Sequence, residues 1–526
     1  MSIVTSSSLS FRRPSALTVG VLIALASVSS ASTAAVRSVG PGKTYATPCK
    51  AIAAAANGDT IEIDGTQTYR GDVCGIYQND LTIRGVNGRP KIDAAGMNSM
   101  GKAIWVVIGA NITVDNVEMF GAKVADQNGA ALRLEGNNFT LRRSFLHDNE
   151  NGILTSPHPT SNILIENSEF GYNGYGTGYT HNLYIGTVNS LTFRYNYSHD
   201  ANVGHNLKSR AKFNNISYNR FSSTPPGQTG STASGQPSYE VDLPNAGTAY
   251  VIGNVIEQPS ANQNPTMLAY GEEGVTNPGQ DLYVINNTFL NDDSSRGTFI
   301  MVGSGVTTPV VMQNNIFSGV GATTTQLNAI DRTNYRSLAP AFVNRSAYDL
   351  RPAAGAPTIN AGSAAGLSAS GVSLVANAQY LHTASVQPRA VASTIDIGAY
   401  AAIAVVTPAP TPTPTVSPTP TTTPTPTTTP TPTPTPTVSP TPTPTPTVTP
   451  PVTSAPNPFL NNAEIWTTCA TEGQTCRFKG RRMVRYGAGN MLAFKNATGS
   501  IACTSAVFGD PATGKAKICQ YSSILR

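Results

Sequence analysis

One short pattern recurs through most of the first two thirds of the chain and constrains its fold more than any other feature. Each copy alternates apolar and polar residues, as a strand with one buried face does, and then places an asparagine near a further apolar or aromatic residue. The copies carry Asn116, Asn167, Asn196, Asn219, Asn254, Asn287 and Asn315. From Asn167 onward the asparagines lie 29, 23, 35, 33 and 28 residues apart, by subtraction of their numbers.

A repeat of this length, built of strands with no helical pattern between them, is typical of a β-solenoid in which each coil buries its apolar face against the next. Stacked asparagines can hydrogen-bond along such a solenoid and tolerate a left-handed bend at a corner. A β-sandwich is the alternative, but it predicts hairpin turns and shorter spacings. We therefore expect an all-β fold, a parallel β-helix. A short helix within residues 43–56 would cap its open end.

Changes in composition divide the 526 residues into four parts. Residues 1–35 have the charged start, short apolar run and small-residue end of a secretory signal peptide, cleaved after Ala34 or Ala35. Residues 36–405 form the expected β-helix domain. Alternating Thr and Pro in residues 406–456 predict an extended spacer, and residues 457–526 a small module. No stretch is suited to spanning a membrane, so we expect a secreted protein, and a monomer.

The cysteines and the charge distribution add detail to this division. Secretion would place all six cysteines in an oxidising compartment, which favours disulfides. Cys49 and Cys74 could hold the capping helix, while the pairing of the other four, all in residues 457–526, stays open. These last residues carry nine Lys/Arg against three Asp/Glu, which suggests an anionic partner. A basic surface that only aids solubility is the alternative.

Three strand-like runs concentrate polar residues near the middle of the chain: 181–185, 205–210 and 239–243. If these strands stack in register, alternation sends every second side chain outward. The side chains expected on that outer face are Asn182, Tyr184, Asn206, Lys208, Arg210, Glu240 and Asp242. We interpret this face as an active site, with the loop of residues 222–237 as a wall of its cleft.

These residue types suit removal of a proton from a carbon beside a carboxylate, which needs a cation, a base and an acid. Arg210 can hold a uronate carboxylate with its planar guanidinium. Lys208 is the expected base, because the like charge of Arg210 would lower its pKa. Tyr184 is the expected proton donor. Strand alternation would bury His181 and His205, so they are catalytic candidates only if they lie at the corner before each strand. The alternative is that they are buried histidines whose hydrogen bonds are satisfied inside the protein.

The repeats resemble the right-handed parallel β-helix of secreted bacterial polysaccharide lyases and epimerases. Residues 348–362 and 396–400, with Gly355-Ala-Pro-Thr-Ile-Asn360-Ala-Gly362 and Asp396-Ile-Gly-Ala-Tyr400, are similar to the closing coils of such proteins. Residues 457–526, with Cys469-Ala-Thr-Glu-Gly-Gln-Thr-Cys476, resemble a disulfide-bonded module of secreted carbohydrate-active enzymes. We interpret this module as β-rich and sugar-binding. The alternative is that most of its aromatic residues simply form its core.

The resemblance implies a lysine or arginine base, hence Lys208 or Arg210, and in some relatives calcium held by acidic side chains. Candidate calcium ligands are Glu240, Asp242 and Glu272. Side chains expected to contact the substrate are Asn182, Asn206 and Tyr270. The expected partner is an anionic polysaccharide rather than nucleic acid.

Four activities remain open from the sequence. A lyase and a C5-epimerase share the proton abstraction, on a uronate polymer such as alginate or pectate. A glycoside hydrolase would use Glu240 and Asp242, although residues two apart on one strand are rather close for hydrolysis. A non-catalytic adhesin is the fourth. Separately, Lys208 and Arg210 could be solvated surface charges paired with Glu240 and Asp242 rather than catalytic groups.

Overall fold

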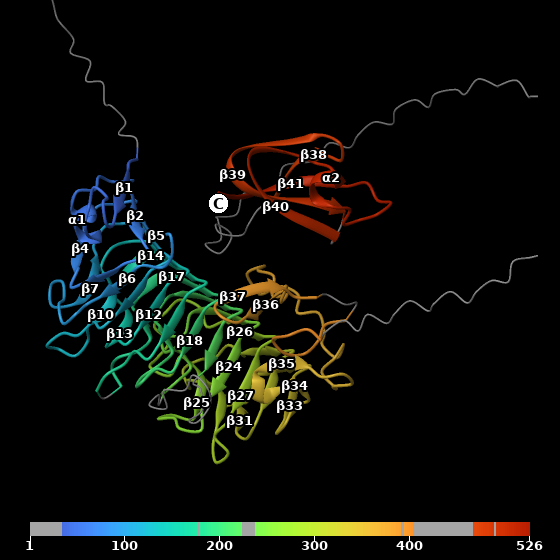
Figure 1. The fold of residues 1–526 in the computed structure, drawn as a ribbon. Coiled ribbons are helices and arrows are strands. Elements are labelled where there is room, and N and C mark those ends of the chain that lie inside the picture. Colours follow the sequence, from blue (N-terminus) through green and yellow to red (C-terminus); the bar gives the residue numbers. More distant parts are fainter. Residues whose placement is uncertain are drawn as a thin grey trace, which may run out of the picture. The chain divides into compact units, whose positions relative to one another are not determined.

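The computed structural model describes residues 34–176, 178–222, 237–390, 394–402, 466–488 and 491–525. These belong to two units, one within Met1–Ala409 and the other within Pro410–Arg526 (Figure 1). The expected signal peptide, apart from its last two residues, the Thr-Pro spacer and nearly all of the 222–237 loop lie outside the described residues. No helix in the described part of the chain is long and apolar enough to cross a membrane.

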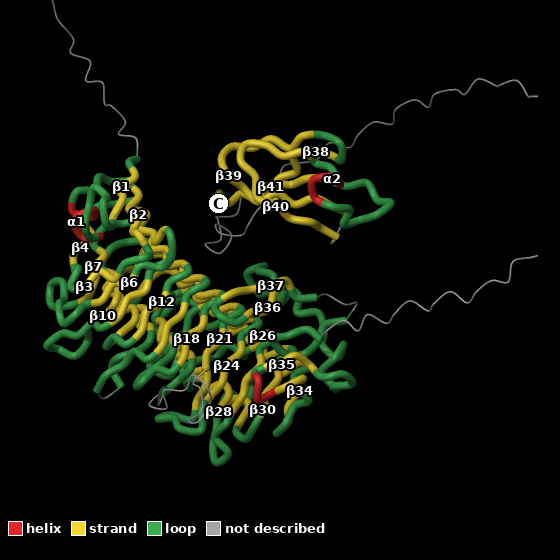
Figure 2. The backbone as a smooth tube through the Cα atoms, viewed as in Figure 1, coloured by secondary structure: helices red, strands yellow, loops and turns green. Residues whose placement is uncertain are grey.

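The first unit is a right-handed parallel β-helix of three long parallel sheets, visited in turn by each coil (Figures 1 and 2). The first sheet has twelve strands: β1 (Val36–Val39), β2 (Thr60–Asp64), β5 (Thr82–Val86), β8 (Ile112–Asp115), β11 (Phe139–Arg142), β14 (His158–Glu166), β17 (Val188–Arg194), β20 (Phe213–Ser217), β23 (Thr248–Ile252), β26 (Leu282–Ile285), β29 (Val311–Gln313) and β32 (Ile330–Arg332).

The second sheet has eleven strands: β3 (Thr68–Arg70), β6 (Lys91–Asp93), β9 (Glu118–Phe120), β12 (Phe145–His147), β15 (Glu169–Gly171), β18 (Tyr197–His199), β21 (Arg220–Ser222), β24 (Val255–Gln258), β27 (Thr288–Asn291), β30 (Ile316–Ser318) and β33 (Tyr335–Ser337). The third sheet has ten: β4 (Cys74–Ile76), β7 (Ala103–Val107), β10 (Ala130–Leu134), β13 (Asn151–Thr155), β16 (Leu183–Ile185), β19 (Leu207–Ser209), β22 (Val241–Leu243), β25 (Thr266–Tyr270), β28 (Thr298–Val302) and β31 (Ala322–Thr324). The predicted solenoid is confirmed.

The core fills the space between the sheets because alternate residues of each strand point inward. Leu183, Leu207, Val241 and Leu268 occupy such positions on neighbouring strands of the third sheet and are fully buried. Successive coils add rungs of this kind, so one continuous core runs from β1 to β30.

The predicted helix caps the first coil, over a shorter range than expected. It is α1 (Pro48–Ala53), which starts with a proline, a residue whose fixed φ suits the first helical turn. Its buried residues Ala51 and Ile52 join the core. A disulfide between Cys49 and Cys74 ties the helix to β4.

The asparagine repeat forms a buried ladder, but the expected left-handed bend lies one residue earlier. Asn219 donates its side-chain amide to Asn254 Oδ1 at 2.9 Å, and Asn254 donates to Asn287 Oδ1 at 3.0 Å. The left-handed residue precedes each ladder position, as Tyr218 does with φ of 56°. Asn116 and Asn167 take that bend position themselves and stand outside the ladder. A ladder residue must point its side chain into the interior, whereas the bend requires only a residue that can adopt a left-handed backbone conformation. The ladder position and the bend position are therefore occupied by different residues.

The segment after β33 does not add coils. It forms two antiparallel pairs, β34 (Phe342–Asn344) with β35 (Asp349–Pro352) and β36 (Ala378–Leu381) with β37 (Ser385–Pro388), joined in the first pair by the 3-10 turn Arg345–Ala347. Leu350 and Ala399 then cover Val255 and Leu290 on the outer face of the second sheet. The segment that resembles closing coils therefore shields a sheet face instead.

The second unit is a small β-rich module. Its antiparallel sheet has the order β38 (Trp466–Thr471), β41 (Ile518–Leu525), β39 (Thr475–Ala488), β40 (Met491–Ala502), and α2 (Ser505–Phe508) packs beside it. The predicted disulfides are present, Cys469–Cys476 and Cys503–Cys519. Three of these cysteines belong to the buried core, together with Val484 and Tyr486.

Candidate active site

The third sheet brings Tyr184, Lys208 and Asp242 into one rung on its outer face. Strand β16 pairs Tyr184 with Lys208 of β19, and β19 pairs Lys208 with Asp242 of β22. Lys208 Nζ lies 2.6 Å from Asp242 Oδ2 and 2.7 Å from Glu273 Oε1. The lysine side chain is only 9% exposed, so it is not a solvated surface charge.

Arg210 follows β19 and is held by three partners. Its Nε donates to the Tyr184 hydroxyl at 2.8 Å, and its terminal nitrogens donate to Asn245 Oδ1 at 2.6 Å and Glu273 Oε2 at 2.5 Å. Glu273 therefore bridges Lys208 and Arg210. Sequence reasoning gave no role to Glu273 or Asn245, because loops after the strands supply them; the only signal was the acidic pair that follows Tyr270 and Gly271.

The expectation that Arg210 lowers the pKa of Lys208 is wrong. Burial acts to lower that pKa, but Asp242 and Glu273 outweigh it and raise the pKa above its ordinary value. The positive charge of Arg210 is countered by its ion pair with Glu273, so its repulsion does not set the pKa of Lys208. In this structure Lys208 is an ammonium.

His181 and His205 lie at the corner before β16 and β19, as the catalytic reading requires, yet their hydrogen bonds rule out a role as base. His181 Nδ1 accepts from the backbone N–H of His205, and His205 Nδ1 accepts from that of Tyr239, both at 3.0 Å. Their rings stack with centroids 4.7 Å apart. Burial lowers the pKa of both, for His181 to about 3. Each neutral ring therefore carries its proton on Nε2 and can only donate there.

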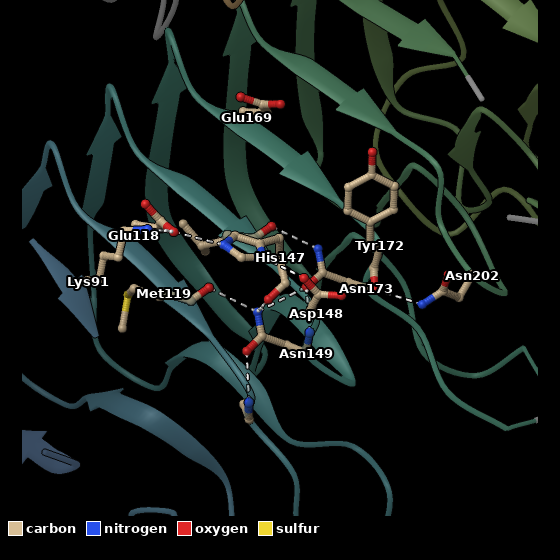
Figure 3. Close-up of polar contacts among 12 residues, drawn as sticks. Lys91, Glu118, Met119, His147, Asp148, Asn149, Glu169, Tyr172, Asn173 and Asn202 are labelled. Atoms are coloured by element: carbon tan, nitrogen blue, oxygen red, sulfur yellow. Dashed lines mark hydrogen bonds and ion pairs between the residues drawn. The ribbon is translucent and has the colours of Figure 1, made fainter. Parts of the chain in front are cut away.

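The expectation that Asn182, Asn206 and Glu240 face outward is wrong. Each of these residues immediately precedes its strand, where the corner turns the side chain inside, and all three are fully buried. Asn182 donates to Asn206 Oδ1 at 2.8 Å, and Asn206 donates to Glu240 Oε2 at 2.5 Å. The same ladder starts at Asn149 and Asn173 (Figure 3).

Glu240 and Tyr270 are thus part of the interior rather than the site. Burial raises the pKa of Glu240 well above its usual range, so it closes the ladder as a neutral acid. Tyr270 is fully buried and donates its hydroxyl to the carbonyl of Gly247. Neither side chain reaches a substrate on the outer face. Glu240 and Asp242 therefore cannot act together on one scissile glycosidic bond, as the hydrolase alternative requires.

Three carboxylates gather beside Lys208. Single oxygens of Asp242, Glu272 and Glu273 lie within 4.8 Å of one another. Asp242 Oδ1 and Glu272 Oε2 are buried and have no hydrogen-bond partner. Burial, together with Asp242, raises the pKa of Glu272 to about 9. The donor set is of the all-oxygen kind that suits Ca²⁺.

Beside this cluster, the outer face of the third sheet carries a groove of about 750 Å³. Its walls include residues 126–128, Arg133, residues 154–157, residues 178–181, Tyr184, His205, Lys208, Arg210 and Glu273. Tyr179 stands on its rim and is 88% exposed. The groove follows the stacking direction of the strands, because Arg133 of β10 and Lys208 of β19 lie on the same sheet three strands apart. It can accept an extended polymer.

The three long parallel sheets, with a polar groove on the outer face of the third, define a parallel β-helix protein. No family model matches the chain. Among solved structures it is similar to the pectate lyase Pel9A, with a TM-score of 0.50, 15% sequence identity, and coverage of 70% of this chain and 97% of that one. This likeness concerns the fold.

Proposed function

We propose that this protein is a secreted lyase that cleaves a uronate-containing polysaccharide by β-elimination in the groove of the third sheet. The observation that carries the proposal is the set formed by Tyr184, Lys208 and Arg210, three groups of different chemistry held together by hydrogen bonds and ion pairs in one polymer-sized groove. Its fold, found in a pectate lyase, supports the same conclusion. The expected signal peptide and the disulfides suit an extracellular protein.

Each group has a distinct part in the reaction. Arg210 binds the uronate carboxylate in place of Glu273, whose side chain is 44% exposed, and stabilises the charge that develops on that carboxylate. Lys208, once deprotonated, takes the proton from C5, and the electron pair forms the C4–C5 double bond as the C4–O bond breaks. Tyr184 donates its hydroxyl proton to the leaving oxygen, and the Arg210 N–H that it accepts stabilises the phenolate.

The histidine stack supports binding. His181 lines the groove and is fixed as a neutral Nε2–H donor, so it can hydrogen-bond a sugar hydroxyl but cannot remove a proton. An epimerase would use the same proton abstraction and return the proton to the other face, and it therefore stays a second outcome of the test below.

The carboxylates Asp242, Glu272 and Glu273 fit a calcium ion, because two of their oxygens are buried without partners. A bound Ca²⁺ would supply positive charge to a substrate carboxylate. Within the chain, two of these carboxylates, Asp242 and Glu273, hold Lys208 in place and raise its pKa.

The test is Lys208→Ala, assayed on pectate, alginate and glycosaminoglycans by the ultraviolet absorbance of unsaturated uronate. We expect a loss of about 10³-fold or more, since a general base typically contributes 10²–10⁴-fold. The matched control is Lys212→Ala, which removes a lysine that binds only the carbonyl of Pro159 near the surface. Full activity in Lys208→Ala would reject the assignment.

The pH profile is a second readout. The pKa of Lys208 is raised, and a base must be neutral, so the rate should climb with pH well into the alkaline range. New reducing ends without absorbance would indicate a hydrolase. A changed polymer spectrum without cleavage would indicate an epimerase, and binding without any change an adhesin.

A further inference from the structure

The surplus positive charge of the C-terminal module is concentrated on one hairpin. The described residues of the module include two carboxylates, Glu472 and Asp510, and both lie against the same cation, Lys517, at 3.3 and 3.1 Å. The remaining cations are Arg477, Lys479, Arg481, Arg482 and Arg485 on β39, Lys495 on β40, and Lys515. The module's net charge therefore lies mainly along β39.

The two faces of the module's sheet differ in what covers them. Val484 and Tyr486 of β39 point to the buried face, where Tyr486 stacks on Phe508 of α2 with ring centroids 5.2 Å apart. Arg485 lies between them in sequence, so alternation sends it to the opposite face. The described residues bring no second layer against that opposite face.

On this open face, residues from three strands form one row. Thr468 of β38 pairs with Gln520 of β41, which pairs with Arg485 of β39. Gln520 accepts from Arg485 Nε at 2.8 Å and donates to Thr468 Oγ1 at 3.0 Å. The Arg485 guanidinium also lies over the Trp466 ring, 4.5 Å from its centroid. These contacts hold the guanidinium stacked against the indole.

We propose that this open face of the module, built on Trp466 and Arg485, is a second binding site for the anionic polysaccharide. A uronate presents an apolar ring face and a carboxylate on the same sugar, and the adjacent indole and guanidinium match both. Stacking and the Gln520 contact fix the guanidinium beforehand, which reduces the entropy that binding costs. Arg481 shares the parity of Arg485 on β39 and can therefore complement a further carboxylate along the polymer. The identity of the polymer rests on the proposed function; the site itself does not.

The test uses the full chain, secreted and disulfide-bonded, in affinity electrophoresis through gels containing polygalacturonate or alginate. Arg485→Ala and Trp466→Ala should each weaken retardation about tenfold, the loss expected for one charge-assisted or stacked contact. Lys515→Ala, which removes an exposed cation in the segment between α2 and β41 of the same module, is the matched control. Arg485→Lys keeps the charge but not the planar fork, and should bind nearly as weakly as Arg485→Ala.

Two further readouts separate this site from the groove. If the groove is a lyase, cleavage of short soluble oligouronides should be unchanged in Arg485→Ala, because the groove alone binds them. If it is not, the retardation assay still tests the module by itself. Circular dichroism checks that the variants fold. Binding equal to that of Lys515→Ala would overturn the proposal, as would full binding by Arg485→Lys or tighter retention by DNA-containing gels than by either polyuronate.

Discussion

Replacing Asn254 by alanine tests whether the internal asparagine ladder holds the coils together. Asn254 is fully buried and sits between two neighbouring rungs. Its amide donates to the carbonyl of Ile216 at 2.8 Å and to Asn287 Oδ1 at 3.0 Å. Its Oδ1 accepts from both the backbone and the side-chain N–H of Asn219, each at 2.9 Å. The substitution removes all four hydrogen bonds.

The cost follows from what these groups lose. Each hydrogen bond contributes about 1 kcal/mol net, and a buried group left unpaired costs about 1–3 kcal/mol. Both N–H groups of Asn219 lose their acceptor in the interior, while Asn287 Oδ1 still accepts from the backbone N–H of residue 254. We therefore expect a loss of about 4 kcal/mol in the free energy of unfolding, a large part of what a domain typically has.

The assay is urea unfolding followed by circular dichroism, with Asn189→Ala as the control. Asn189 makes a single exposed contact with Asn162 and should cost about 0.5 kcal/mol. The double variant Asn219→Ala/Asn254→Ala should lose less than the sum of the single variants, because they share two hydrogen bonds. If Asn254→Ala were as mild as the control, the ladder would not be a source of stability.

Three other perturbations probe the corner, the cap and a buried acid. Gly204→Ala should lower the free energy of unfolding by several kcal/mol and reduce lyase activity, because the new Cβ would lie 2.0 Å from the carbonyl oxygen of Thr180. The control is Gly355→Ala, which is also at positive φ but in open space. It should lose only about 1 kcal/mol in the same urea unfolding assay. Cys49→Ser opens the disulfide that ties α1 to β4 and should lower the unfolding free energy by about 3 kcal/mol; an unchanged midpoint would show that α1 holds without it. Burial outweighs the neighbouring arginines and raises the pKa of Glu257 to about 7, so the folded state binds an extra proton. Its stabilising contribution to the free energy of unfolding, roughly 3 kcal/mol, is complete below about pH 4.5 and lost as the pH rises to about 7. Glu257→Gln should lack this decline. Parallel pH profiles of unfolding free energy for the variant and the wild type would contradict the assignment.

The sequence predicted the coils better than it predicted the site. Alternation placed Tyr184, Lys208 and Asp242 correctly on one outward rung, because they lie within strands that pair in register. It failed at Asn206 and Glu240, which stand at the corner where the chain turns before a strand. There the backbone departs from the two-residue period, and the side chain turns inward.

What the sequence determined by itself is the β-helix, because its repeat is a local pattern that successive coils share. The capping helix and the disulfide-bonded tail could also be predicted, from the local composition and cysteines of their own segments. What only the tertiary structure decided is the state of the site. Glu273 lies 65 residues from Lys208 in the chain, yet it is one of the two carboxylates that keep this lysine charged. A pKa depends on burial and on charges a few ångströms away, and these are brought together by the stacking of coils rather than by any local pattern.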